Sequence, residues 1–97
     1  MNLIEQDGVL CGFRPEHFTP AAETSAGLPF PFHVHREEYL GSEHLYYGEI
    51  GEAKAVARFP ATVTVEAVPG GTYDFAVASE HIKRFDPVTG LRIRETL

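Results

Sequence analysis

Short apolar stretches, many of them alternating between apolar and polar positions, recur along the chain and are separated by glycine and proline. Alternation with a period of two is typical of a strand with one buried face, and β-branched and aromatic residues are common in these stretches. The pattern predicts about six or seven short strands and no long helix. The expected strands cover Gly8–Arg14, His33–Leu40, Glu43–Ile50, Ala53–Arg58, Thr62–Ala67, the stretch bearing Tyr73, Phe75 and Val77, and Leu91–Ile93.

The segments between these strands carry turn and loop signals. Pro15–Phe18 is predicted to form a helical turn, because proline is favoured at the first position of a helix. Ser79–Ile82 is predicted to form a second helical turn. Gly41-Ser42 predicts the turn of a hairpin, whereas residues 19–31 have the composition of a proline-rich loop and residues 1–7 form a leading segment. Short strands at even spacing predict a small, closed or nearly closed β-barrel, or a sandwich, because both limit exposed sheet edges.

Composition and charge narrow the classes of function. The chain has 97 residues, which fit a single domain spanning 1–97, and its 43% apolar and 23% charged residues are typical of a globular protein. A formal charge of -6 disfavours nucleic acid and anionic lipid as partners. The apolar runs are too short for a membrane helix and no signal peptide is evident, so we expect a cytoplasmic protein. The lone Cys11 excludes an internal disulfide and is expected to pack in the core.

A metal site is the sharpest candidate for chemistry. His33 and His35 are two apart on a predicted strand, so they share a face and could bind one metal together with Glu38, with His44 of the paired strand as a fourth ligand. This pattern suggests a β-barrel that senses a small ligand or a metal, or a cupin-like metal enzyme. However, Glu38 comes too early for the cupin pattern, and no histidine lies close behind the turn at Pro69-Gly70-Gly71.

Solvent exposure is the competing interpretation of the same stretch. The face that carries His33 and His35 would also carry Glu37 and Tyr39, and charged and imidazole side chains commonly face water. Glu37 and Glu38 point to opposite faces of a strand, so they do not form an acid and base pair. No nucleophile elbow and no phosphate-binding Gly-Lys-Ser/Thr motif occurs. We therefore expect no catalysis by this chain.

Four ordered segments of the chain follow patterns known from one protein family. Gly12-Phe13-Arg14-Pro15-Glu16-His17-Phe18 is similar to the pattern "G-[IF]-R-P-E-[DH]-[LF]", and Val34 to Glu43 is similar to "V-x-x-x-E-x-L-G-x-E". Val56-Ala57-Arg58 is similar to a "V-A-R" strand, and Phe85 to Ile93 is similar to a closing "F-D-x-x-T-G-x-R-[IL]". The usual "P-G-D/E" turn is here Pro69-Gly70-Gly71. Over about residues 8 to 93 the chain thus resembles the C-terminal part of the ATP-binding subunits of carbohydrate ABC importers, of the maltose and glycerol-3-phosphate types.

The resemblance implies a TOBE domain, an oligonucleotide/oligosaccharide-binding (OB) type barrel with a regulatory and dimer-supporting role. Its partners would be the ATPase domain of the same subunit, a second copy of the subunit, the membrane subunits indirectly, and a cytoplasmic regulator. The complex would lie on the inner face of the cell membrane. The Walker A and signature motifs are missing, so ATP and Mg would bind an ATPase domain absent here, and this chain would carry no cofactor.

The positions that match the family patterns are expected to be structural or to lie at an interface. Glu16 would bind turn amides or pair with Arg14, and a direct ligand role for these two residues is the alternative. We call the full set the signature residues: Gly12, Arg14, Pro15, Glu16, Glu38, Leu40, Gly41, Glu43, Arg58, Phe85, Asp86, Thr89, Gly90 and Arg92.

Overall fold

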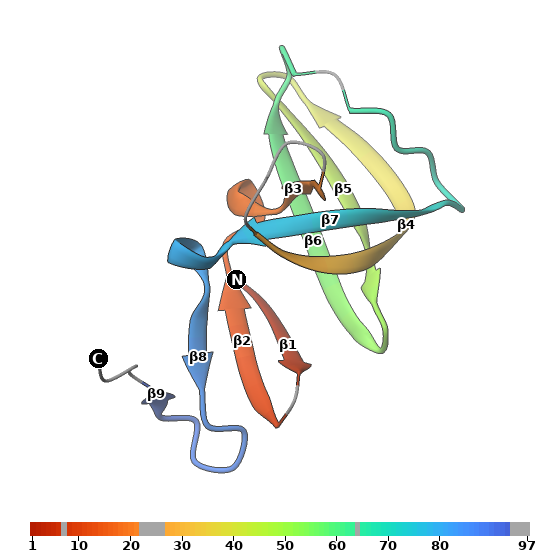
Figure 1. Ribbon diagram of the computed structural model, residues 1–97. Helices are drawn as coiled ribbons and strands as arrows, with labels where there is room; N and C mark the ends of the chain where they lie inside the picture. Colours follow the sequence, from red (N-terminus) through yellow and green to blue (C-terminus); the bar gives the residue numbers. More distant parts are fainter. Residues whose placement is uncertain (7, 22–26, 64, 94–97) are drawn as a thin grey trace.

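The computed structural model describes residues 1–6, 8–21, 27–63 and 65–93, which fold into two β-sheets and short 3-10 turns (Figure 1). The mainly β prediction is confirmed, and so are the two helical turns. Among the described residues there are nine strands, more than the six or seven expected. The elements are β1 (Asn2–Gln6), β2 (Val9–Phe13), η1 (Pro15–His17), β3 (Thr19–Pro20), β4 (Gly27–Leu40), β5 (Glu43–Ile50), β6 (Ala53–Pro60), β7 (Thr72–Ala78), η3 (Ser79–His81), β8 (Lys83–Phe85) and β9 (Arg92–Ile93).

The larger sheet is a curled, five-stranded half barrel with the order β3-β7-β4-β5-β6. Its long strand β4 pairs with β7 over residues 27–33 and with β5 from His33 onward, so this strand turns the corner of the sheet. A β-bulge between Val34 and Arg36 marks the change of partner. Bulges bend a strand and increase its twist, which closes a sheet toward a barrel. This architecture is consistent with the expected small OB-type barrel.

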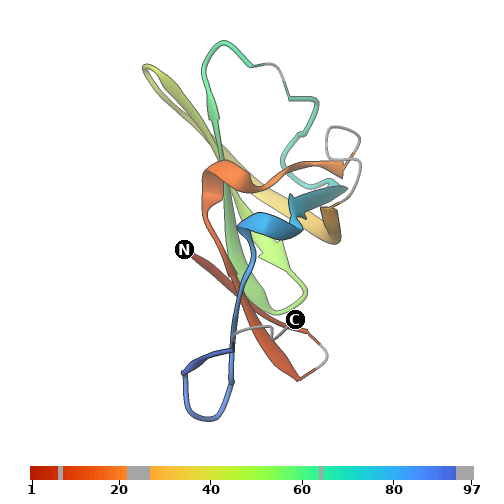
Figure 2. The same cartoon turned by 60° about the vertical axis from the view of Figure 1, so that its left-hand side comes forward.

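The smaller sheet has the order β1-β2-β8-β9 and extends from one side of the half barrel, as Figure 2 shows. Asn2 joins the two sheets: its side-chain amide donates to the Val56 carbonyl at 2.8 Å, and its Oδ1 accepts from the Val56 N–H at 2.9 Å. The Asn2 side chain thus bonds to the backbone at the outer edge of β6, as a neighbouring strand would. Within the described part of the chain, no helix is long and apolar enough to span a lipid bilayer.

Aromatic rings fill the space inside the curled sheet. Phe18 is fully buried, and its ring centroid lies 5.0 Å from that of Phe32, 5.0 Å from that of Phe75 and 5.2 Å from that of Phe13. Rings at these separations in tilted or edge-on arrangements attract one another beyond the burial of their surface. Cys11 is buried near this cluster, as expected of a packing residue.

Gly48 allows β5 to approach the bulged part of β4. A Cβ atom at this position would overlap the His33 backbone carbonyl and would lie 3.0 Å from the Phe32 ring. In the pairing of β4 with β5, Gly48 lies opposite Val34, next to the bulge. A side chain at position 48 would therefore force apart the corner that closes the half barrel.

Two segments differ from the expectation drawn from their composition. Residues 19–31 are not a loop throughout, since Thr19–Pro20 form β3 and Gly27 begins β4, while residues 22–26 lie outside the described part of the chain. Among the described residues, the first half of β4 has a partner strand on one side only, so Pro29 and Pro31 can direct their missing N–H toward the free edge. Residues 2–6, expected as a leading segment, form β1 and pair with β2.

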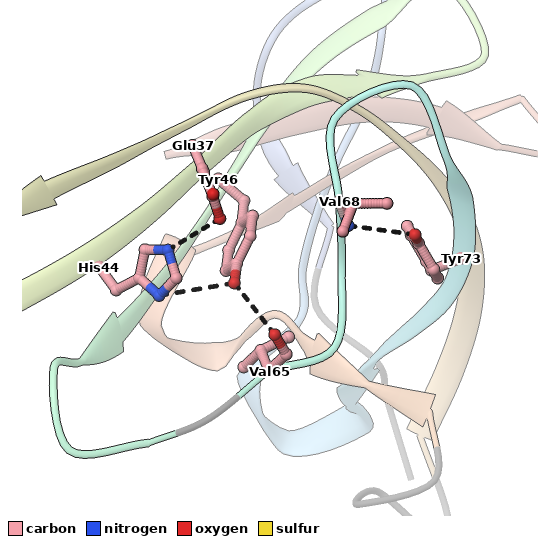
Figure 3. A network of polar contacts seen from close by, with 6 residues as sticks. All are labelled: Glu37, His44, Tyr46, Val65, Val68 and Tyr73. Atoms are coloured by element: carbon pink, nitrogen blue, oxygen red, sulfur yellow. Dashed lines mark hydrogen bonds and ion pairs between the residues drawn. The ribbon is translucent and has the colours of Figure 1, made fainter.

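The predicted strand at Thr62–Ala67 is wrong for the described residues of this segment. The alternation is real, because Ala67 is buried and Val63 and Val65 are partly buried while Thr62 and Glu66 are exposed. The backbone, however, bonds to side chains rather than to a neighbouring strand: the Val65 carbonyl accepts from the Tyr46 hydroxyl at 3.2 Å, and the Val68 N–H donates to the Tyr73 hydroxyl at 3.1 Å (Figure 3).

Candidate interaction surface

The Arg14-Pro15-Glu16 corner joins the two sheets. Arg14 is extended, with φ -80° and ψ 147°, and Pro15 opens the 3-10 turn η1. The His17 N–H donates to the Arg14 carbonyl at 3.0 Å, and the Phe18 N–H donates to the Pro15 carbonyl at 3.3 Å. The next side chain, Phe18, enters the core, so this corner is fixed by burial as well as by hydrogen bonds.

Glu16, Glu43 and Arg58 come together on the surface from three separate signature segments. The Arg58 guanidinium donates to the Glu16 carboxylate at 3.0 Å, and its Nε lies 4.0 Å from Glu43 Oε1. A bond from its own backbone N–H holds the pKa of the Glu16 carboxyl below its usual value, partial burial opposes this, and the charge of Arg58 supports it. Glu16 thus binds a backbone amide of the turn, which is one of its two expected roles. Its ion-pair partner is Arg58 and not Arg14, the other expectation, and Arg14 adds a weaker attraction.

The surroundings of this cluster combine charge with exposed apolar side chains. A shallow hollow is lined by Glu16, Ser42, Glu43, Arg58, Phe59 and Pro60. The tip of the neighbouring β4–β5 hairpin exposes Tyr39 and Leu40, at 66% and 51% of their full surface. Gly41 forms the turn of that hairpin with a positive φ of 68°. We call the cluster of Glu16, Glu43 and Arg58 together with Leu40 and Gly41 the signature surface. It offers exposed apolar side chains for contact and charged groups for hydrogen bonding.

The signature residues near the C-terminus form a turn that is held by its own groups. Asp86 Oδ1 accepts from the Val88 and Thr89 N–H groups at 2.8 and 3.1 Å, and Thr89 Oγ1 accepts from the Leu91 N–H at 3.2 Å. Gly90 adopts a positive φ of 74°. These residue types are explained by the turn itself, which leads into Arg92 on the exposed strand β9.

Phe85 and Gly12 are neighbours on the outer face of the small sheet. A Cβ atom at Gly12 would lie 3.1 Å from the Phe85 ring and 2.7 Å from the Met1 sulfur. Glycine here lets neighbouring side chains cross the strand. Glu38 lies elsewhere, on β4, where its carboxylate is 3.9 Å from the Arg36 guanidinium.

The structure brings His33 and His35 together, with ring centroids 4.9 Å apart, but the four residues proposed as metal ligands do not form one cluster. His33 Nδ1 lies 2.8 Å from Thr72 Oγ1, and His35 Nε2 lies 2.9 Å from Glu49 Oε1. Within the described ranges no group of three or more histidine, cysteine, aspartate or glutamate side chains could hold a metal ion. The shared face predicted for the two histidines is thus confirmed, whereas His44 lies on the other face of the sheet, because it is an odd number of residues away from Glu49, the partner of His33. The bulge between Val34 and Arg36 shifts the later side chains of β4 to the opposite face.

The same shift places Glu37 and Tyr39 beside His44 and Tyr46 instead of beside His33 and His35. Figure 3 shows Glu37, His44 and Tyr46 pointing toward one another. His44 is buried, its Nε2 lies 3.2 Å from Glu37 Oε2, and its ring stacks on Tyr39 with centroids 3.9 Å apart. Sequence reasoning missed this network, although the alternation along Glu43–Ile50 places His44 and Tyr46 on one face.

Tyr46 is the centre of this network and ties the segment after β6 to the sheet. Its hydroxyl lies 3.5 Å from His44 Nδ1 and donates to the Val65 carbonyl at 3.2 Å. Burial raises the pKa of Tyr46 to about 12, with smaller contributions from Glu37 and Tyr39. The phenol is therefore a structural donor.

Comparison with known proteins adds evidence from outside the chain. The sequence profile described as "TOBE domain" matches residues 11–85. Similar curated proteins include the "sn-glycerol-3-phosphate import ATP-binding protein UgpC" of Ruegeria sp. (strain TM1040), 36% identical over 89 residues that cover 90% of this chain and 24% of the relative. The proteins of the same name from Burkholderia pseudomallei (strain 1710b) and Escherichia coli (strain K12) are 34% and 32% identical, covering 86% and 84% of this chain and 22% of each relative. The chain thus spans about a quarter of the length of these relatives.

Proposed function

Because this chain belongs to the TOBE domain family, we propose that it is the regulatory and dimer-supporting C-terminal domain of the ATP-binding subunit of a sugar ABC importer. In this role it takes part in ATP-driven import of a carbohydrate or a related phosphorylated polyol without hydrolysing ATP itself. ATP and Mg bind a separate ATPase domain of the same subunit. The similarity to import ATP-binding proteins over most of this chain supports the proposal.

The proposed role in contact rests mainly on one observation, which is that Glu16, Glu43 and Arg58 lie together on the surface. Three segments that are separate in the sequence supply one half-exposed ion-paired cluster, with side chains that expose 37%, 43% and 39% of their surface. Exposed ion pairs contribute little to folding stability. Arginine and carboxylates beside an exposed hairpin tip suit recognition of another protein surface, where they set orientation and partner choice.

The proposed partners follow from this assignment. The domain contacts the ATPase domain of its own subunit and a second copy of the subunit, reaches the membrane subunits indirectly, and offers its surface to a cytoplasmic regulator. Its place is the inner face of the cell membrane, as part of the transporter complex. The net charge of -6 disfavours nucleic acid as a competing partner.

A chimeric subunit tests the assignment. The chain replaces the matching C-terminal quarter of the Ruegeria subunit, and ATP hydrolysis is measured for the chimera, for the truncated subunit and for the chain alone. We expect hydrolysis by the chimera at a rate different from that of the truncated subunit, and none by the chain. Hydrolysis by the chain alone, or a chimera that matches the truncated subunit in every rate, would contradict the proposal.

A further inference from the structure

A groove separate from the signature surface lies where the small sheet meets the turns η1 and η3. It encloses about 180 Å³. Five of its lining residues carry a charge or an imidazole ring, and they come from the corner after β2, from the two turns and from β8. These are Arg14, His17, Glu80, His81 and Lys83.

The register of the sheet explains why the cations meet there. Gly12 pairs directly with Lys83, so these two positions share a face of the sheet. Phe13 turns into the core, where it is 1% exposed, and the extended residue Arg14 returns to the face of Gly12. The guanidinium and the ammonium therefore approach the same groove from adjacent strands.

Two histidines complete the lining from the adjoining turns. His17 on η1 stacks against His81 on η3, with ring centroids 3.8 Å apart and planes at 17°. Both turns are anchored by buried residues that follow them, Phe18 at 0% and Ile82 at 8% exposure. The imidazole pair is thus held in place before any ligand arrives.

Among the described residues, neither Arg14 nor Lys83 forms an ion pair with a carboxylate, whereas Arg36 and Arg58 each do. Glu80 is the carboxylate in the lining, and it lies 4.0 Å from His81 Nε2 with 78% of its side chain exposed. The groove thus combines two cations and two imidazole rings with one carboxylate, in a protein of net charge -6.

We propose that this groove binds a phosphate group, either free inorganic phosphate or the phosphate of a small monoester. Arginine offers paired N–H donors that match phosphate oxygens, lysine adds a point charge, and imidazole N–H groups can donate to the remaining oxygens. The volume of about 180 Å³ is sufficient for a group of this size. The inference concerns residues of this chain alone and does not depend on the proposed role in an importer.

NMR titration of the 97-residue chain tests the site. Inorganic phosphate, glycerol 3-phosphate, chloride and uncharged glycerol are added at constant ionic strength and pH, and the ring signals of His17 and His81 are followed. We expect saturable shifts with both phosphates and none with chloride or glycerol. The phosphate compound that binds with the lower dissociation constant shows whether the groove prefers free phosphate or a monoester. Shifts that never saturate, or that chloride reproduces, would overturn the proposal.

Variants separate the groove from general charge effects. Replacing both groove cations, Arg14→Gln with Lys83→Gln, should weaken phosphate binding at least about tenfold, which corresponds to about 1.4 kcal/mol, because hydrogen bonds to charged groups are stronger than those between neutral groups. The matched control pairs Lys54→Gln with Arg92→Gln, removes the same charge elsewhere, and should change affinity less than about twofold. Circular dichroism confirms folding of each variant.

Two outcomes of this series would reject the site. One is equal loss of phosphate affinity in the groove variant and in the matched control. The other is tighter binding of an aspartate-rich peptide than of either phosphate, with the same residues perturbed, which would make the groove a protein-docking surface. If the groove variant does not fold, His17→Asn supplies the test, because loss of one imidazole donor should weaken phosphate binding without removing a formal charge.

Discussion

The guanidinium of Arg58 donates a hydrogen bond of 3.0 Å to the carboxylate of Glu16, although the two residues lie 42 positions apart in the chain. Arg58 belongs to the edge strand β6, and Glu16 belongs to the 3-10 turn that follows β2. This pair connects the corner between the two sheets with the edge of the half barrel. It is half exposed and therefore available to a partner.

Loss of this pair should cost little folding stability. Arg58→Ala is expected to lower the free energy of unfolding by less than about 1 kcal/mol, because exposed ion pairs contribute roughly 0.2–1 kcal/mol. Urea denaturation followed by circular dichroism measures the change, with Lys54→Ala as a control on the same strand. A loss above about 3 kcal/mol would show that the pair serves the fold instead.

Gly48→Ala should be strongly destabilising. The added methyl group would overlap the His33 carbonyl and press on the Phe32 ring, so we expect a loss of at least about 3 kcal/mol. Gly41→Ala is the control, since Gly41 has a positive φ of 68° but no neighbour within 4 Å, and should cost about 1–2 kcal/mol. Equal losses at the two positions in thermal or urea unfolding would refute the close approach of β4 and β5.

Asn2→Ala should release β1 from the edge of β6. The variant removes both hydrogen bonds to the Val56 backbone from a buried side chain, and we expect a loss of about 1–3 kcal/mol. Hydrogen exchange should accelerate at the Val56 amide in particular. The exposed residue Glu5 of the same strand is the control, and Glu5→Ala should stay within about 0.5 kcal/mol. An unchanged Val56 amide would argue against the bridge.

Stability should fall at high pH through Tyr46. Its pKa is raised to about 12 in the folded chain, whereas a tyrosine in the unfolded chain loses its proton near pH 10. The folded state therefore binds more protons between these values, and unfolding becomes easier as pH rises through that window. Below about pH 10 this contribution is constant.

The control for this prediction is Tyr46→Phe. The variant should be less stable at neutral pH, because the bond to the Val65 carbonyl is lost, and should show a weaker decline between about pH 10 and 12. Denaturation midpoints across this range provide the measurement. An identical decline in both proteins would assign the pH dependence to other groups.

The half barrel was partly predictable from the sequence because its central hairpin follows simple rules. Glu43–Ile50 matches β5, and Gly41 and Ser42 form the turn before it. The first half of β4 was missed because proline opposes a strand unless one edge is free, and only the fold reveals that edge. Thr62–Ala67 was mistaken for a strand because alternation reports burial, whereas the missing backbone partner leaves no trace in the sequence.

The candidate site was predictable only as a set of residues. The four segments that resemble the family identified Glu16, Glu43 and Arg58 as signature residues. The contact between these residues depends on long-range strand pairing, which cannot be predicted from their spacing in the sequence. His33 and His35 meet as their spacing predicted, but the bulge that moves Glu37 and Tyr39 to the face of His44 could not be predicted from the spacing. The basic groove arises from two turns and two strands that meet only in the folded chain.

Sedimentation velocity on the chimeric subunit tests the central claim, that this domain supports assembly through the signature surface. With ATP present, the chimera should dimerise at least about tenfold more tightly than the truncated subunit, which corresponds to about 1.4 kcal/mol of contact. Arg58→Glu in the chimera should return the dissociation constant toward that of the truncated subunit while the domain stays folded. Equal dissociation constants for the chimera, its Arg58→Glu variant and the truncated subunit would contradict the account.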